Sequence, residues 1–144
     1  MKIIIDTSIL VDIDRKNQKT IDIMKSLTKD HDVIISVITV SEILTGSYLR
    51  KDQDIAVKKA KLVMGQMFWV DVDPKIAEKA SEINAYLIIN GKIIEFQDVL
   101  IAATALILNC DFILTFNKEH FERIPALINR IYNPLELKEK MSEK

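Results

Sequence analysis

The sequence has few cysteines, glycines and prolines, which limits the kinds of protein that it can encode. Its 144 residues include one cysteine, three glycines and three prolines. The single Cys110 excludes an internal disulfide and a multi-cysteine zinc site, and its apolar surroundings (AATALILNC) favour a small core residue. Because 49% of the residues are hydrophobic, the chain can bury a sizeable core, and its length fits one domain.

A dominant charge and a long apolar run are missing too. Twenty basic and 21 acidic residues give a formal net charge of −1, so the chain as a whole lacks the electrostatic signature of a nucleic-acid binder, although a local patch stays open. No apolar stretch reaches the roughly 18 residues of a membrane-spanning helix, and the first residues lack the apolar region and cleavage site of a signal peptide. We therefore expect a soluble, cytoplasmic protein without membrane contact.

Short apolar runs alternate with helical periodicity along the chain. The predicted strands are 2–5, 33–36, 68–72, 112–115 and a last one near 130–132. The predicted helices are 8–13 with Thr7 or Ser8 as N-cap, 20–28, 37–49, 55–67, 74–89 and 98–109. Because the strand cores are continuous apolar runs, we expect an α/β fold whose parallel sheet is covered on both faces. The charged residues 135–144 are expected to form a frayed tail.

Three acidic residues differ from the others because apolar residues surround them. Asp6 follows III and precedes TSILV, Glu42 lies inside VITVSEILTG, and Asp98 begins DVLIAATALIL. Each has a structural explanation when taken singly: a turn for Asp6, a partly exposed helix position for Glu42 and a helix N-cap for Asp98. Together they favour a shared cation site, because like charges in one cleft repel unless a cation binds them.

The expected ion is Mg²⁺ or Mn²⁺, because the available ligands are carboxylates. His31 and His120 are too few and too far apart in the sequence for a histidine-based metal site. The sequence has no P-loop, GxGxxG or GxSxG motif, and Ser8 stands where a phosphoaspartyl phosphatase needs its second aspartate. The remaining chemistry is hydrolysis by a metal-activated water, most naturally at a phosphodiester. Asp6 and Asn117 each follow a predicted strand, at the edge of the sheet where ligands of parallel sheets bind.

Three segments resemble, in order, the signature segments of PIN-domain ribonucleases, most of all the toxin of VapBC-type toxin–antitoxin pairs. They read IIIDTSILVDI, IISVITVSEILTG and GKIIEFQDVLIAATALILNCDFILTFNKEHFERI. The resemblance covers residues 1–134 as one nuclease domain and leaves 135–144 as the tail. It implies a three-layer sandwich around a central parallel sheet of about five strands. It also implies a Mg²⁺- or Mn²⁺-dependent endoribonuclease that acts as the toxin of a type II toxin–antitoxin system.

The resemblance assigns roles to single residues. It implies that Asp6, Glu42 and Asp98 hold the metal ion and that Thr7 or Ser8 orients Asp6 or a metal-bound water. Thr115 and Asn117 match the segment that closes the site. Many members have an aspartate in place of Asn117, and because an amide brings no negative charge, one metal ion or two stays open. The basic residues that could follow a substrate path, each more often a solvated surface charge, are Arg15, Lys16, Arg50, Lys51 and Arg123.

The resemblance also implies partners. These are an RNA substrate, a cognate antitoxin that covers a hydrophobic groove and sends an arm into the active site, and a second copy in a homodimer. Apolar residues within 21–27 and 37–49 are candidates for the groove, with core packing as the commoner explanation. Two other functions stay open: a catalytically weak PIN-like module that binds RNA or antitoxin, and a metal-dependent phosphohydrolase of small substrates.

Overall fold

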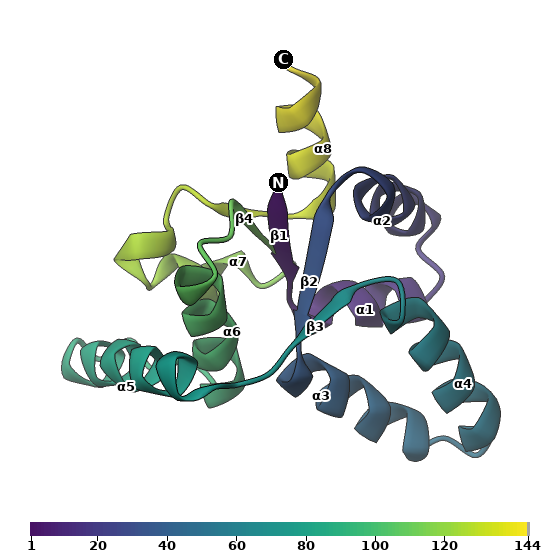
Figure 1. Ribbon diagram of the computed structural model, residues 1–144, viewed down its shortest axis with the longest axis horizontal. Helices are drawn as coiled ribbons and strands as arrows, with labels where there is room; N and C mark the ends of the chain where they lie inside the picture. Colours follow the sequence, from purple (N-terminus) through teal and green to yellow (C-terminus); the bar gives the residue numbers. More distant parts are fainter. Residues whose placement is uncertain (144) are drawn as a thin grey trace.

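The computed structural model describes residues 1–143 and contains a five-stranded parallel sheet between two layers of helices (Figure 1). The strand order is β3-β2-β1-β4-β5 and every neighbouring pair is parallel. The strands are β1 (Lys2–Ile5), β2 (Asp32–Ser36), β3 (Phe68–Val70), β4 (Phe112–Leu114) and β5 (Ile131–Tyr132). The predicted α/β sandwich is therefore confirmed.

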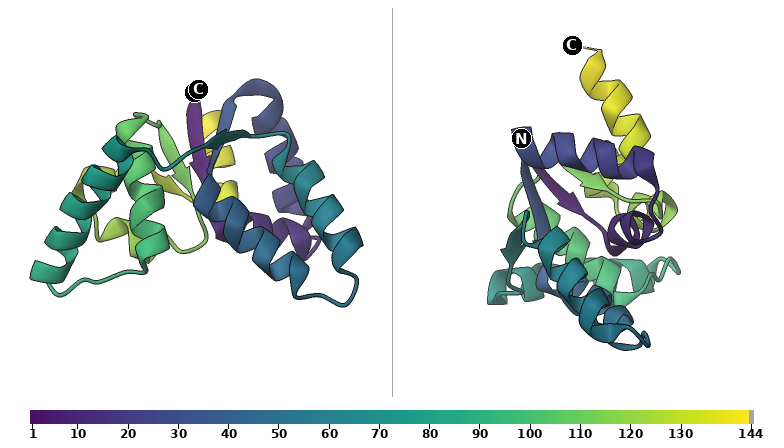
Figure 2. Two further views of the ribbon diagram at one scale, coloured as in Figure 1. Left: turned by 60° about the horizontal axis from the view of Figure 1, so that its bottom comes forward. Right: turned by 90° about the vertical axis from the view of Figure 1, so that its right-hand side faces the viewer.

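Eight α-helices and one short 3₁₀ helix lie within the described residues. They are α1 (Thr7–Asp14), α2 (Gln18–Asp30), α3 (Val37–Tyr48), α4 (Gln53–Met64), α5 (Pro74–Ile89), α6 (Phe96–Ile107), α7 (Lys118–Glu122), η1 (Pro125–Leu127) and α8 (Pro134–Ser142). Figure 2 shows in its left view the α3–α4 pair and the α5–α6 pair on opposite sides of the molecule, with the strands between them. No helix within 1–143 is both long and apolar enough to cross a membrane.

The central strand explains why the strand sequences are apolar without a break. Ile4 of β1 packs into one core cluster, together with residues of α5 and α6. Its neighbours Ile3 and Ile5 point to the other face of the sheet, into a second cluster built with α1, α2 and α8. Successive side chains of a strand alternate between the two faces, and both faces are buried at positions 3–5, so all three of these positions in β1 are isoleucines; Lys2, at the exposed start of the strand, is not apolar.

Cys110 follows α6 and is 1% exposed within the first cluster. Burial raises the pKa of its thiol to about 11, so the side chain stays neutral at physiological pH. The sequence-based view of Cys110 as a small core residue is confirmed.

Two predicted helix starts are wrong, for reasons that bear on the site. The N-cap of α1 is Asp6 rather than Thr7 or Ser8, because the hydroxyls of Thr7 and Ser8 bond to Glu42 and Asp6 instead of capping the helix. Helix α6 begins at Phe96 with Glu95 as N-cap. Asp98 is therefore the third residue of α6, and the N-cap alternative for it is wrong. The predicted 55–67 helix lies instead at Gln53–Met64, and β3 ends two residues before the predicted 72.

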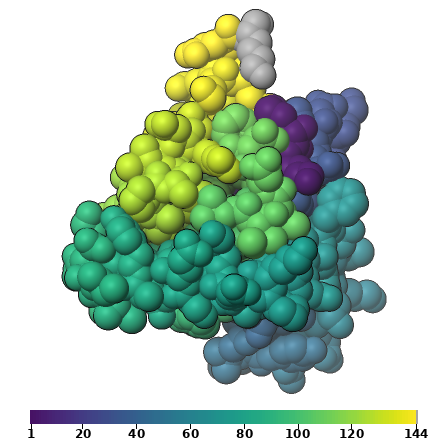
Figure 3. All heavy atoms as spheres, turned by 60° about the vertical axis from the view of Figure 1, so that its left-hand side comes forward, coloured from purple at the N-terminus to yellow at the C-terminus, as the bar shows by residue number. Residues whose placement is uncertain are grey.

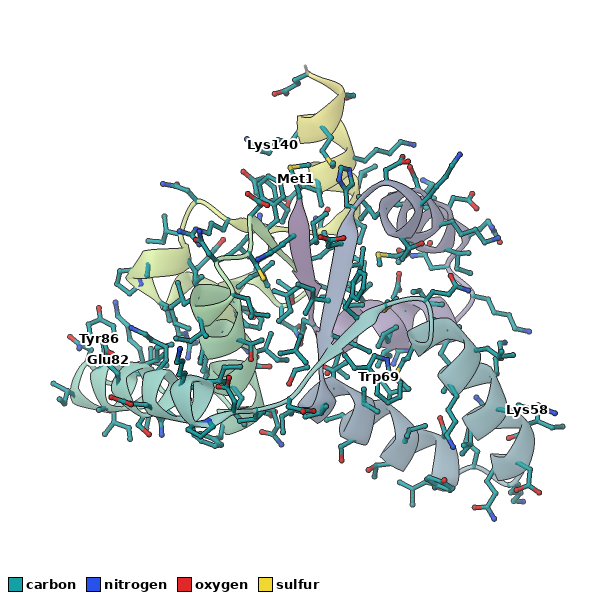
Figure 4. The ribbon with its side chains drawn as sticks, in the orientation of Figure 1. Met1, Lys58, Trp69, Glu82, Tyr86 and Lys140 are labelled. Carbon is teal, nitrogen blue, oxygen red and sulfur yellow. The ribbon has the colours of Figure 1, made fainter. Side chains whose placement is uncertain are left out.

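The predicted frayed tail is wrong over most of its length. Pro134–Ser142 forms α8, which begins with a capping box between Asn133 and Glu136. Leu137 is fully buried in the second core cluster. Lys140, labelled at the end of the molecule in Figure 4, lies 5.5 Å from the centre of the Tyr132 ring on β5. A strong cap and one buried leucine are enough to order this charged segment. The remaining predicted tail residue, 144, lies outside the described residues.

Candidate active site

An acidic cleft of about 460 Å³ lies at the carboxyl edge of the sheet, where β1 and β4 end. It brings together Asp6, Glu42, Asp98 and Asn117, which come from four separate parts of the sequence. The full lining consists of Asp6, Thr7, Ser8, Val11, Asp12, Arg15, Glu42, Glu95, Asp98, Phe116, Asn117 and His120. In an open parallel sheet, this edge is where ligands bind, so the predicted position of the site agrees with the geometry.

Asp6 is the most deeply placed of these acids, at 3% exposure. Its backbone amide donates to Leu114 across the sheet, which fixes the residue at the junction of β1 and β4. The Ser8 and Thr115 hydroxyls both donate to its Oδ2, each over 2.8 Å. A nearly buried carboxylate needs such donors, because its burial is otherwise costly. These bonds hold one carboxylate oxygen in a defined position at the base of the cleft.

Glu42 reaches the cleft from the second turn of α3. The Ser36 hydroxyl caps this helix by accepting from the Ile38 amide, so α3 begins directly where β2 ends. The Thr7 hydroxyl donates to Oε1 of Glu42 over 2.8 Å and lies 3.2 Å from the Thr39 hydroxyl. Thr7 therefore positions Glu42, whereas Ser8 positions Asp6. The sequence did not indicate which of the two hydroxyl residues orients an acid. In the structure each contacts a different one.

Asp98 projects from the first turn of α6 and meets His120 of α7. The Nδ1 atom of His120 lies 2.9 Å from Oδ2 of Asp98, and both side chains are partly exposed. A proton on Nδ1 donates to the carboxylate in this arrangement. Asp98 also lies near the N-terminus of α6, where the helix dipole favours negative charge.

Burial and neighbouring charges alter the pKa of two of the acids, Glu42 and Asp98. Burial raises the pKa of Glu42, the Thr7 hydrogen bond opposes this, and the nearby charges of Asp6, Asp98 and Glu95 raise it further. Burial also raises the pKa of Asp98, the hydrogen bond with His120 opposes this, and Asp6 and Glu95 add to the rise. These shifts report an excess of negative charge in one partly desolvated space, which a bound cation would relieve.

Asn117 closes the cleft from the loop after β4. Its backbone amide donates to the Thr115 hydroxyl over 2.9 Å, and the Phe116 amide donates to the Ser8 hydroxyl over 3.0 Å. The Thr115 and Ser8 hydroxyls thus link this loop to the Asp6 carboxylate. The Asn117 side chain is exposed at the rim, where its amide oxygen contributes no charge.

The acidic side chains line an open cleft and do not form a complete coordination site for an ion. Within residues 1–143, no three histidine, cysteine, aspartate or glutamate side chains stand close enough together to hold one ion as they are placed. The donors are nevertheless hard oxygen atoms, and after burial, neighbouring negative charges also raise the pKa of Glu42 and of Asp98. Such a donor set suits a small divalent cation that keeps part of its water shell.

The sequence reasoning missed the contact of His120 with Asp98 and the place of Phe116 in the wall. Glu95 and Asp12 also line the cleft. One signal could have identified His120: it lies three residues after Asn117, one helical turn away, if KEHF is helical. Among the basic candidates, Arg15 lines the cleft, whereas Arg50 pairs with Asp14 and Asp52 outside it.

Known proteins match this chain over nearly its whole length. The model of the PIN domain family matches residues 3–127. Ribonuclease VapC1 of Methanocaldococcus jannaschii is 32% identical over 133 residues, which cover 92% of this chain and 88% of that protein. Two crystal structures also match over 92% of this chain and 98% of the matched chain. VapBC2 from Rickettsia felis, bound to a DNA fragment from their promoter, has a TM-score of 0.83 at 26% identity. FitAcB from Neisseria gonorrhoeae has a TM-score of 0.77 at 25% identity.

Proposed function

We propose that this chain, which belongs to the PIN domain family, is a divalent-metal-dependent endoribonuclease. We also propose that it is the toxin of a type II toxin–antitoxin system. The observation that carries the proposal is the meeting of Asp6, Glu42 and Asp98, from three different elements, in one cleft. The ribonuclease named above and the VapBC structures agree with both halves of the proposal. The expected location remains the cytoplasm, where RNA and a cognate antitoxin are both present.

We assign Mg²⁺ or Mn²⁺ to the cleft that Asp6, Glu42 and Asp98 line, with one or two of these carboxylates as direct ligands and the others contacting the ion through water. Mg²⁺ usually binds through one or two carboxylates and keeps several waters, so an open hollow of separate acids suits it. When bound, such an ion lowers the pKa of a water molecule and offsets the charge that develops on the phosphate. Asn117 adds an oxygen without adding charge, which favours one ion over two.

The chain's own residues prepare this site before any ion arrives. Ser8 and Thr115 fix Oδ2 of Asp6, Thr7 fixes Oε1 of Glu42, and the His120 ring is within hydrogen-bond distance of Oδ2 of Asp98. Side chains that are already oriented need little reorganisation when substrate binds. Arg15 is the permanently charged cation in the lining and is our candidate for contact with an RNA phosphate.

The groove for the antitoxin is a second hollow of about 320 Å³ between α1, α3 and α4. Apolar side chains dominate its wall, and Thr7 and Glu42 line both this groove and the acidic cleft. An apolar segment seated there would therefore lie next to the active site. Of the predicted groove segments, 37–49 contributes to the wall, whereas Ile23, Met24 and Leu27 of α2 are buried in the core.

The predicted homodimer has one candidate surface. Residues 86–96 at the end of α5 and in the loop before α6 carry five exposed large apolar side chains, namely Tyr86, Ile88, Ile89, Ile93 and Phe96. Figure 3 shows α5 and its following loop, in teal, as a band across the lower part of one face. Glu95 of the same segment lines the cleft, so a second copy on this surface would lie beside the active site. Sedimentation of wild type and Ile89→Lys would test self-association.

The test of the nuclease proposal is RNA cleavage combined with Mn²⁺ calorimetry. We expect Mn²⁺ to bind with an affinity on the order of millimolar or tighter. Asp6→Asn and Asp98→Asn should each lower cleavage at least about a hundredfold, because each removes negative charge that would hold the metal ion. Asp54→Asn, which changes an exposed carboxylate outside the cleft, is the matched control and should cleave like wild type. Wild-type cleavage by both cleft variants would refute the proposal.

A second candidate is a catalytically weak PIN-like module that binds RNA or antitoxin, and the neutral Asn117 motivates it. The same calorimetry separates the two functions, because a binding module has no need of Mn²⁺. Asn117→Asp sharpens the comparison: in an enzyme limited by weak metal binding, the added charge should tighten Mn²⁺ binding and increase cleavage.

A further inference from the structure

Phe116 has a position that the proposed chemistry does not explain. The described residues contain 15 exposed large hydrophobic side chains, so exposure alone carries no information. Phe116, at 45% exposure, is the one member of that group in the lining of the acidic cleft. Carboxylates and hydroxyls make up most of the lining around it. An apolar ring there contributes nothing to binding a cation through oxygen ligands.

The backbone that carries this ring is fixed relative to the acids. The Phe116 amide donates to the Ser8 hydroxyl over 3.0 Å, and Ser8 in turn donates to Oδ2 of Asp6. On the next residue, the Asn117 amide donates to Thr115, which also donates to Oδ2 of Asp6. Two short chains of hydrogen bonds therefore join the loop to the deepest carboxylate. These hydrogen bonds hold the backbone that carries the Phe116 ring at the edge of the cleft.

A flat apolar ring beside a phosphodiester site suits one ligand, an unpaired nucleobase. Bases stack on aromatic side chains whatever their sequence, because every base presents a π-face. Carboxylates repel the RNA backbone, so a cleft with five acids and Arg15 needs an attraction that does not depend on charge. Stacking provides that attraction, and it leaves the phosphate next to the base free to approach the acids.

We infer that Phe116 forms a nucleobase-stacking subsite that positions an unpaired nucleotide of the RNA beside Asp6, Glu42 and Asp98. The inference rests on the proposed nuclease function for the identity of the ligand, and it adds a residue that favours unpaired nucleotides over paired ones. Phe116 is a binding residue in this role and takes no part in the transfer of protons or in metal binding.

Three variants test the subsite. Phe116→Tyr keeps an aromatic face, whereas Phe116→Leu keeps apolar bulk and removes that face. Phe68→Leu is the matched control, because Phe68 of β3 is also an exposed phenylalanine, at 60%, but lies outside the cleft lining. The Phe116 side chain is partly exposed and its hydrogen bond uses the backbone, so all three variants should fold, which a melting curve checks.

The probe is a single-stranded RNA oligomer that carries one 2-aminopurine, whose fluorescence falls when the base stacks. With Ca²⁺ in place of Mg²⁺, we expect wild type and Phe116→Tyr to quench it and Phe116→Leu to lose the quenching. With Mg²⁺, Phe116→Leu should lower kcat/KM about tenfold or more, mainly through a higher KM. Replacing one base of the oligomer by an abasic residue should remove the difference between Phe116→Leu and wild type, and so identify the stacked position.

The outcomes separate the subsite from the nuclease proposal. If wild type cleaves RNA and Phe116→Leu matches it in both quenching and KM, the subsite is refuted and the nuclease stands. If wild type cleaves no RNA with Mg²⁺ or Mn²⁺ but quenching still depends on the ring, the nuclease is refuted and the subsite stands. Equal losses in Phe116→Leu and Phe68→Leu would also overturn the subsite, because they would show a general effect of losing an exposed ring.

Discussion

The acidic cleft and the apolar groove share a wall but have opposite character. Thr7 and Glu42 line both, so the cleft and the groove meet along α1 and α3. On the cleft side, the acids are tied by hydroxyls and a histidine and repel one another. On the groove side, Ile13, Ile43 and Val63 are partly exposed apolar side chains. Helices α1 and α3 thus border both the proposed cation site and the proposed antitoxin groove.

The comparison shows that the two sites can be changed separately despite their shared wall. RNA cleavage in the cleft depends on fixed charged groups, whereas antitoxin binding in the groove depends on apolar shape complementarity. Substitutions that alter one property and leave the other should therefore dissociate RNA cleavage from antitoxin binding.

The largest effect is expected for Ala60→Glu, which puts charge and bulk into the groove. Binding of the cognate antitoxin should weaken at least about 30-fold, because a blocked central contact typically costs about 2 kcal/mol or more. RNA cleavage should not change. Leu62→Glu on the exposed side of α4 is the control and should bind normally. Antitoxin binding by Ala60→Glu at wild-type strength, measured by titration, would place the antitoxin elsewhere.

The next effect concerns the histidine on the cleft side. His120→Ala removes the partner of Asp98 and should weaken Mn²⁺ binding about tenfold or more, as is typical for partners of metal ligands. His120→Asn can still donate to Asp98 from a position close to Nδ1 and should recover part of the loss. Calorimetry with Mn²⁺ measures both. If alanine and asparagine behave alike, the contact does not position Asp98.

We expect a smaller effect on how the stability of the metal-free protein depends on pH. The pKa of Glu42 is raised above its ordinary 4.5, so the folded state binds this proton more tightly than the unfolded state. Its contribution to the free energy of unfolding is therefore full below pH 4.5 and is lost as the pH rises through the folded-state pKa. Glu42→Gln should melt at a higher temperature than wild type, by a margin that widens from pH 4 to pH 7.

The exposed Glu82 on α5, labelled in Figure 4, offers a control for this measurement. Glu82→Gln changes the net charge equally but faces solvent, so its difference from wild type should stay small at every pH. A constant difference between Glu42→Gln and wild type across the same pH range would contradict the crowding of charge in the cleft.

The smallest effect is expected at Gly46 in α3, where an added Cβ would have no heavy atom within 4 Å. Gly46→Ala should raise the free energy of unfolding by about 0.5–1 kcal/mol, because glycine has greater conformational freedom in the unfolded chain. Chemical denaturation measures the change. Since Gly46 lines the groove, a loss of antitoxin binding with unchanged cleavage would show that the partner packs closely there.

Local pattern was sufficient to predict most of the sheet and its helices. Continuous apolar runs located all five strands, and the sequence Asp73-Pro74 located the start of α5, where Asp73 accepts from the Ile76 amide. The sequence pattern did not predict α8, because the stability of this helix comes from a capping box and from Leu137, which packs into the second core cluster. It also misplaced the starts of α1 and α6, where side-chain hydroxyls and acids serve the cleft rather than the helix ends.

What the sequence determined by itself was the fold class and the identity of the unusual acids, since burial preference and periodicity are properties of short segments. The tertiary structure alone decided that Asp6, Glu42 and Asp98 share a cleft, that His120 contacts one of them and that Phe116 lines the wall. These relations join residues more than 20 positions apart, or depend on the direction of a side chain at the end of a strand. Contacts of that kind follow from the packing of whole elements, which no local stretch of sequence encodes.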